Sequence, residues 1–123
     1  MGFMTDRKRA VGMGSAKSGT MQHWRMMISS VALIGLVPQF IFTFGAILGQ
    51  PYEDILAYYQ RPIPAGIAVL TLLVGFYHFR SGVQTLIEDY VQGTPRKVLI
   101  IAMICLSYGA AAFGVLAVLR VAL

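Results

Sequence analysis

Residues 63–87 have the sequence IPAGIAVLTLLVGFYHFRSGVQTLI, in which Arg80 is the only formally charged side chain. A hydrocarbon core about 30 Å thick is crossed by roughly 20 helical residues, so this run is long enough to span a bilayer once. Two further runs, residues 26–48 and 98–119, contain no charge and are also long enough. The pattern predicts an all-α membrane protein with three antiparallel transmembrane helices.

The composition agrees with this fold class. Of the 123 residues, 57% are hydrophobic and 12% are charged, and the mean hydropathy is +0.69, outside the range of a soluble domain of this size. Three crossings leave too little chain for a separately folded catalytic domain. We expect a basic N-terminal tail at 1–24 and a three-helix domain at 25–123, with helices at about 25–49, 63–90 and 97–120.

The single cysteine, Cys105, lies in the third apolar run. One thiol can form neither an intramolecular disulfide nor the multi-thiolate site of an iron–sulfur cluster, so we interpret Cys105 as a packing or lipid-facing residue. The first 20 residues carry charges among glycines and serines and lack an apolar h-region. We therefore expect no cleavable signal peptide and expect the first spanning helix to direct insertion.

The distribution of basic residues predicts the orientation, because Lys and Arg in short flanking segments are retained on the cytoplasmic side. Seven basic residues lie before the first span or in the segment between the second and third spans, and two lie on the other side. We therefore expect a cytoplasmic N-terminus and a periplasmic C-terminus. Retention and anionic headgroups explain the basic tail without a nucleic-acid partner. The seven are Arg7, Lys8, Arg9, Lys17, Arg25, Arg96 and Lys97, and the two are Arg61 and Arg120.

Several local features refine the helices. Trp24 is placed at the cytoplasmic interface, and Pro38 is expected to kink the first helix. Residues 51–62, which contain three tyrosines, are expected to form a short interfacial segment on the outer side. The small residues at 109–114 favour close contact between the third helix and a neighbour.

His78 is the strongest functional candidate, because an ionisable side chain at membrane depth is costly unless it is paired, wetted or bound. Gly75 and Gly82 share its helix face and leave a strip beside the imidazole without side chains. A histidine bonded to a carbonyl or hydroxyl of an adjacent helix is the alternative. The flanking glycines favour a haem ligand, since a porphyrin needs clearance beside its axial histidine. The chain has no second histidine at membrane depth, so a bis-histidine haem needs its other ligand from another subunit.

Asp89 and Tyr90 follow His78 by eleven and twelve residues. A helical rise of about 1.5 Å per residue places them roughly 17–18 Å further along the axis, near the cytoplasmic surface. Acids and tyrosines at this level are also ordinary solvated helix ends and interface residues.

The pattern His78-x-x-x-Gly82-x-Gln84-x-x-x-x-Asp89-Tyr90, on the second of three helices, resembles the family of membrane-anchor subunits D of succinate dehydrogenase, respiratory complex II. The stretch GSAKSGT at 14–20, followed by His23 and Trp24, resembles the alphaproteobacterial form of this hydrophobic anchor. The resemblance covers nearly the whole chain in length, topology and motif placement.

The resemblance implies that His78 is an axial ligand of the haem b iron, shared with a cytochrome b556 partner subunit, and that Tyr90 hydrogen-bonds ubiquinone. A phenol can donate to a quinone carbonyl, and Asp89 could orient or reprotonate it. The further implied partners are an iron–sulfur subunit and a flavoprotein subunit. The chain would then be a multi-pass, non-catalytic anchor in the cell inner membrane, for electron transfer from succinate to quinone in the tricarboxylic acid cycle and respiratory chain.

The chain departs from the family at Ile28, where many members have an arginine five residues beyond the position of His23. His23 and Arg25 are candidate contacts of a haem propionate; alternatively, Arg25 snorkels and His23 only flanks the bilayer. Arg80 lies about 200° around the helix from His78, off the glycine strip. A partner carboxylate, a propionate and snorkelling are all open for Arg80.

Three other functions compete with this interpretation. The nearest is the anchor of a fumarate reductase. A small transporter could use His78 and Arg80 as a relay, although further intramembrane acids and internal pseudo-symmetry are not visible. A structural assembly protein would use the glycines only for close packing.

Overall fold

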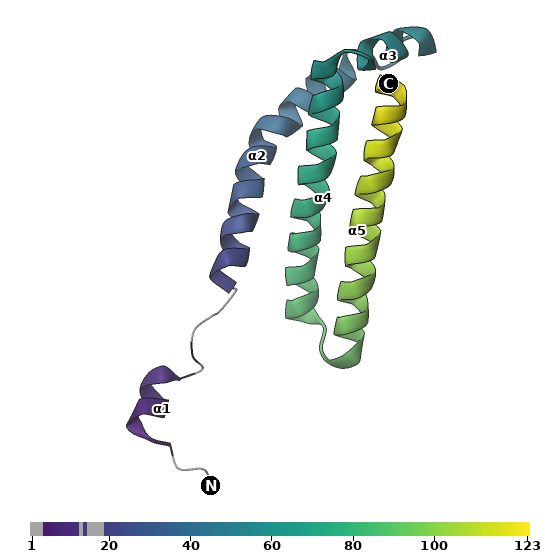
Figure 1. Cartoon of the computed structure of the whole chain (residues 1–123). Helices are drawn as coiled ribbons and strands as arrows, with labels where there is room; N and C mark the ends of the chain where they lie inside the picture. Colours follow the sequence, from purple (N-terminus) through teal and green to yellow (C-terminus); the bar gives the residue numbers. More distant parts are fainter. Residues whose placement is uncertain (1–3, 13, 15–18) are drawn as a thin grey trace.

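The computed structural model describes residues 4–12, 14 and 19–123, and within them the chain is all-α. The described residues contain three helices long enough to span a membrane. Figure 1 shows the long helices side by side, with a short helix across one end of them. The helices are α1 (Asp6–Val11), α2 (Gly19–Gly45), α3 (Tyr52–Tyr59), α4 (Pro62–Tyr90) and α5 (Gly93–Ala122). Lys17 and the neighbouring residues of the GSAKSGT stretch lie outside the described residues.

Each of α2, α4 and α5 is long and apolar enough to cross a membrane. The fold class predicted from the three apolar runs is therefore confirmed for the described residues. Helix α4 packs against both α2 and α5. The backbones of α2 and α5 do not pack closely in the described part of the chain, although side chains of both helices line one apolar cavity of about 290 Å³. Figure 1 shows the start of α2 and the α4–α5 connection at one end of this layer, and α3 and the C-terminus at the other.

The helix ends differ from the hydropathy pattern by a few residues. Helix α2 begins at Gly19, whereas the apolar run suggested a start near Arg25, because polar residues continue the helix beyond the apolar segment. Helix α4 begins with Pro62 and Pro64, whose missing amide donors are tolerated in a first turn. At its other end Val91 is extended, and Gly93, at φ 72°, begins α5 in a conformation that favours glycine.

Pro38 lies inside α2, where its ring removes one backbone hydrogen bond. Figure 1 shows that the ribbon of α2 bends towards α4 in its C-terminal half, which contains Pro38. Residues 51–62, predicted as an interfacial segment, contain α3, which contacts both α4 and α5. Burial, and secondarily the nearby Tyr58, raise the pKa of Tyr59 in α3, so that its phenol stays neutral.

Small side chains make the closest helix contacts. Ala65, Ala68 and Ala111 are buried, and a Cβ at Gly114 would lie 3.2 Å from Leu72 Cδ1, so α5 approaches α4 closely there. Large apolar side chains instead point outwards, including Phe42 and Phe113 at 77% exposure. Close packing through small residues with an apolar exterior is the arrangement expected of helices in lipid.

Candidate functional site

His78 is half-buried on α4 and meets Ser29 of α2. The Ser29 hydroxyl lies 3.0 Å from His78 Nδ1, across a sequence separation of 49 residues. Ser29 is itself buried, at 5% exposure, so the pair lies within the α2–α4 contact. The hydroxyl partner on an adjacent helix, one of the two alternatives for this histidine, is therefore present, but it occupies only one of the two ring nitrogens.

The hydroxyl of Ser29 also indicates which imidazole nitrogen carries the proton. Its single hydrogen has a partner in the Met26 carbonyl oxygen, 2.8 Å away, and a carbonyl can only accept. In the arrangement in which Ser29 donates this hydrogen to Met26, the hydroxyl accepts from His78 and Nδ1 is the protonated nitrogen. Nε2 then keeps its lone pair, and no hydrogen bond to Nε2 is formed by the described residues. A neutral imidazole with Nδ1–H held and Nε2 free is the form that binds a metal.

The glycine strip beside His78 is open. A Cβ built at Gly75 or at Gly82 meets nothing within 4 Å, so the rest of the described chain leaves the space above both residues empty. Beside Gly75 lies an apolar hollow of about 280 Å³, lined by Thr71, Leu72, Gly75, Phe76 and Phe79. This surface can accept a flat apolar molecule without displacing any side chain of the strip.

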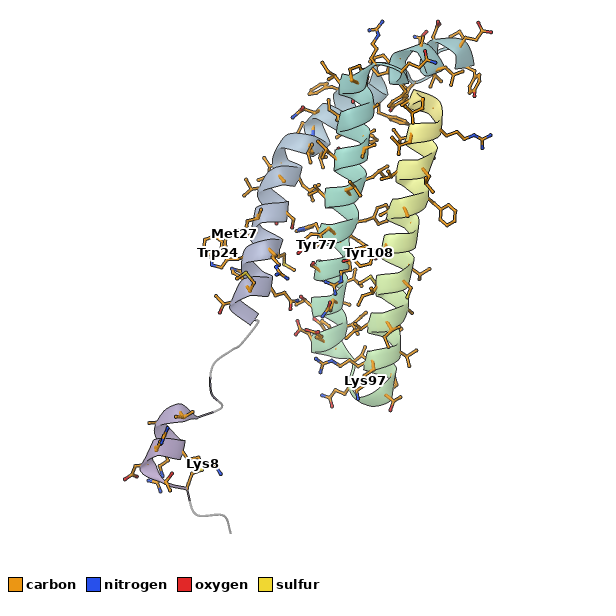
Figure 2. The ribbon with its side chains drawn as sticks, in the orientation of Figure 1. Lys8, Trp24, Met27, Tyr77, Lys97 and Tyr108 are labelled. Carbon is orange, nitrogen blue, oxygen red and sulfur yellow. The ribbon has the colours of Figure 1, made fainter. Side chains whose placement is uncertain are left out.

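On the other side of the α2–α4 contact lie two adjoining cavities, and Arg25 and Tyr77 line both of them. One is apolar, about 400 Å³ in volume, and reaches Ser29. The second, of about 210 Å³, is lined mainly by polar side chains and includes Arg80. Figure 2 shows Tyr77 on the side of α4 that faces α2, whereas Trp24 and Met27 point away from α4.

Asp89 and Tyr90 occupy the last positions of α4, and the structure does not enclose them. Tyr90 is 83% exposed, Asp89 is exposed, and the described residues form no hydrogen bond with either side chain. His23, in the second turn of α2, is exposed as well. The predicted quinone residues are thus accessible in the described part of the chain.

Ser29 is the residue that sequence reasoning missed. A serine in an apolar run commonly bonds to its own helix, as both Ser29 and Ser30 do to Met26. A contact between residues 49 positions apart is not visible in one sequence. The described residues also contain no group of three or more His, Cys, Asp or Glu that could enclose a metal ion.

The three long apolar helices define a multi-pass integral membrane protein. Comparison with known proteins identifies the group. Residues 3–116 match the family described as succinate dehydrogenase/fumarate reductase transmembrane subunit, and the chain belongs to this family.

Two relatives show which kind of subunit in this family the chain resembles. The chain is 42% identical over 123 residues to a succinate dehydrogenase hydrophobic membrane anchor subunit of Paracoccus denitrificans, covering 100% of this chain and 95% of the relative. It is 24% identical over 91 residues to a succinate dehydrogenase membrane anchor subunit of Reclinomonas americana, covering 72% of this chain and 76% of that relative. No solved structure matches. The resemblance inferred from the helix-two motif is confirmed.

Proposed function

We propose that this chain anchors a succinate dehydrogenase in the cell inner membrane and holds haem b through His78, together with a cytochrome b556 partner subunit. The observation that carries the haem assignment is the state of His78: Nδ1 is held by Ser29, and Nε2 is free beside an open strip. Such a histidine at membrane depth supports a metal-bound role.

The residues present fit a haem. Side chains at Gly75 and Gly82 would fill the space next to the imidazole, and both positions are bare and uncovered. The hollow beside Gly75 is apolar, as the porphyrin face requires. When bound, haem b would supply a one-electron relay. His78 would provide one axial nitrogen, and the second would come from the partner subunit, since His23 is the only other histidine. The candidate propionate contacts, His23 and Arg25, stay predictions, and Arg25 lines cavities on the side of the α2–α4 contact away from the strip.

Three helices in one layer support the need for a second anchor chain. A Cβ added at Gly75 or Gly82 of α4 meets nothing within 4 Å, so the described residues do not cover the glycine strip. A partner that covers this strip would bury the haem between two polypeptides. Electrons from succinate would arrive from the flavoprotein through the iron–sulfur subunit, which would dock on the cytoplasmic side.

Tyr90 and Asp89 are our candidates for this chain's contribution to the ubiquinone site. Quinone reduction consumes two protons, and both residues are exposed at the end of α4, where water is available. The Tyr90 phenol would donate a hydrogen bond to a quinone carbonyl, and Asp89 would return a proton to that region. The basic residues at this end, including Lys97 at the start of α5 (Figure 2), favour a cytoplasmic location for it and a periplasmic C-terminus.

The family description also includes fumarate reductase subunits. We assign the succinate-oxidising enzyme because the full-length relative at 42% identity is a succinate dehydrogenase subunit. The test is affinity purification of the tagged chain from its native membrane. We expect a red complex that contains a flavoprotein, an iron–sulfur protein and a second anchor, and that reduces ubiquinone with succinate. A colourless homo-oligomer would contradict the proposal and favour a transporter.

A further inference from the structure

Arg80 is the only formally charged residue of the apolar run 63–87, and the proposed haem and quinone sites do not use it. It projects from α4 into the cavity of about 210 Å³ between α2 and α4, which Arg25 also lines. No Asp or Glu is among the lining residues, which are Met21, Gln22, Arg25, Tyr77, Arg80, Ser81 and Gln84. Two guanidinium groups therefore line one cavity. The carboxylate of Glu88 adjoins the cavity through its hydrogen bond with Gln84 but does not line it, and the excess of positive charge favours an anionic occupant.

Two buried polar atoms in this cavity lack partners. Arg80 Nε is a donor and Gln84 Oε1 is an acceptor, and neither forms a hydrogen bond with the described residues. The side-chain nitrogen of Gln84, Nε2, donates a hydrogen bond to Glu88 Oε1 at 2.9 Å and so fixes the orientation of the amide. The amide oxygen, Oε1, is the atom that lacks a hydrogen-bond partner among the described residues. Buried polar groups nearly always have hydrogen-bond partners. The cavity therefore suits a ligand that has anionic oxygens to accept from Arg80 and a donor group for the Gln84 oxygen.

The cavity is separate from the glycine strip. At about 100° per residue, Gly75 and Gly82 lie within about 60° of His78 around α4, whereas Arg80 and Gln84 lie about 200° and 240° away. The Ser29–His78 contact lies between the two regions. An occupant of the arginine cavity would therefore approach from the opposite side of the α2–α4 pair to a haem on the strip.

The cavity also lies at headgroup level. Counting about 20 residues from Ile63, where the apolar part of α4 begins, the hydrocarbon core ends near Val83, within one turn of Arg80. Trp24, next to Arg25 on α2, is 54% exposed and points outwards, as interface tryptophans do (Figure 2). Basic pockets between transmembrane helices at this level recognise anionic lipid headgroups.

We propose that Arg25 and Arg80 form a binding site for the phosphate of an anionic phospholipid, on the face of the α2–α4 pair away from His78. The guanidinium groups bind the phosphate oxygens, and a headgroup hydroxyl donates to Gln84 Oε1. A glycerol headgroup has both kinds of group. The lipid fills the space between the two helices at the bundle end that carries the N-terminal tail.

The test compares lipid retention by the assembled, purified complex. Wild-type and variant complexes are washed in detergent, incubated with phosphatidylglycerol or phosphatidylcholine, and analysed by native mass spectrometry. We expect wild type to retain phosphatidylglycerol in preference to phosphatidylcholine. Arg80→Gln should reduce phosphatidylglycerol retention severalfold and leave phosphatidylcholine unchanged. Arg120→Gln, which removes the same charge from an exposed arginine at the other end of the bundle, should behave as wild type.

A second variant keeps the test decisive if Arg80→Gln does not assemble. Arg80→Lys preserves the charge but not the forked donors, and intermediate retention is expected. Equal phosphatidylglycerol retention in wild type and Arg80→Lys, together with equal retention in Arg25→Gln, would overturn the site. Unchanged lipid retention with loss of haem in Arg80→Gln would also overturn it and would assign the arginine to a haem propionate instead.

Discussion

The hydroxyl of Ser29 lies 3.0 Å from Nδ1 of His78 and donates its own hydrogen to the Met26 carbonyl. This pair joins the first spanning helix to the second and leaves Nε2 as the free nitrogen of the imidazole. Ser29 therefore links the packing of α2 against α4 to the state of the proposed haem ligand. A histidine of the other tautomer would present N–H, not a lone pair, towards the strip.

Ser29→Ala is expected to raise the reduction potential of haem b while the haem stays bound. A hydrogen bond from Nδ1 makes the imidazole a stronger donor and favours ferric iron, and its loss favours ferrous iron. A bond worth about 0.5–1.5 kcal/mol corresponds to a shift of roughly 20–60 mV at ~59 mV per tenfold for one electron. The measurement is a redox titration of the purified complex.

Ser30 provides the matched control for this titration. Its hydroxyl also donates to the Met26 carbonyl, at 2.9 Å, but it has no contact with His78. Ser30→Ala should therefore leave the potential unchanged, and Ser29→Thr, which keeps a hydroxyl, should restore most of the wild-type value. Equal potentials in Ser29→Ala and wild type would show that Ser29 does not act on the ligand.

Replacement of the strip glycines tests the clearance beside His78. Gly75→Leu and Gly82→Leu introduce side chains into space that the rest of the described chain leaves empty, so the fold of the subunit itself should tolerate them. We expect haem content to fall severalfold while the subunit still inserts. Haem is measured by the pyridine haemochrome assay on purified membranes.

Gly66→Leu is the control for the strip, because it lies on α4 outside the strip and an added Cβ there also meets open space. It should retain haem. Full haem content in Gly75→Leu and Gly82→Leu would mean that nothing occupies the strip.

Gly114→Leu is expected to weaken the α4–α5 contact. An added Cβ already lies 3.2 Å from Leu72 Cδ1, and a larger side chain overpacks the contact by about 1–3 kcal/mol. The purified complex should lose thermal stability, measured by temperature-dependent aggregation. Gly109→Leu, at an open position of the same helix, should have a smaller effect, and adding Leu72→Ala to Gly114→Leu should recover stability. If the double variant does not recover thermal stability, the added side chain at Gly114 clashes with a residue other than Leu72.

Tyr90→Phe is expected to slow ubiquinone reduction about tenfold, the effect of losing one hydrogen bond worth roughly 1.4 kcal/mol at the substrate. Succinate oxidation with an artificial acceptor should persist, because the flavoprotein lies upstream of the quinone. Tyr52→Phe, which changes an exposed tyrosine at the other end of the bundle, is the control. Equal loss of both activities in Tyr90→Phe would argue against a local role at the quinone.

The sequence predicts the three spanning helices well, because runs of apolar residues are the property that bilayer insertion selects. It predicts helix ends less well, since residues 19–24, which include Thr20, Gln22 and His23, precede the apolar run yet belong to α2. Helix α1 begins after an N-cap residue, Thr5, whose hydroxyl accepts a hydrogen bond from the Lys8 amide. The helix has only six residues and no apolar pattern that would predict it from the sequence. The glycine strip follows from spacing alone. Ser29 and the direction of Arg80 depend on how α2 packs against α4, which no local pattern contains.

The most direct measurement of the central claim is the optical spectrum of the assembled complex with His78→Ala, beside His23→Ala, which changes the other histidine. We predict that His78→Ala abolishes or alters the reduced haem b bands at equal amounts of flavoprotein and iron–sulfur subunit, while His23→Ala retains them. An unchanged haem spectrum in His78→Ala would contradict the assignment of His78 as an axial ligand.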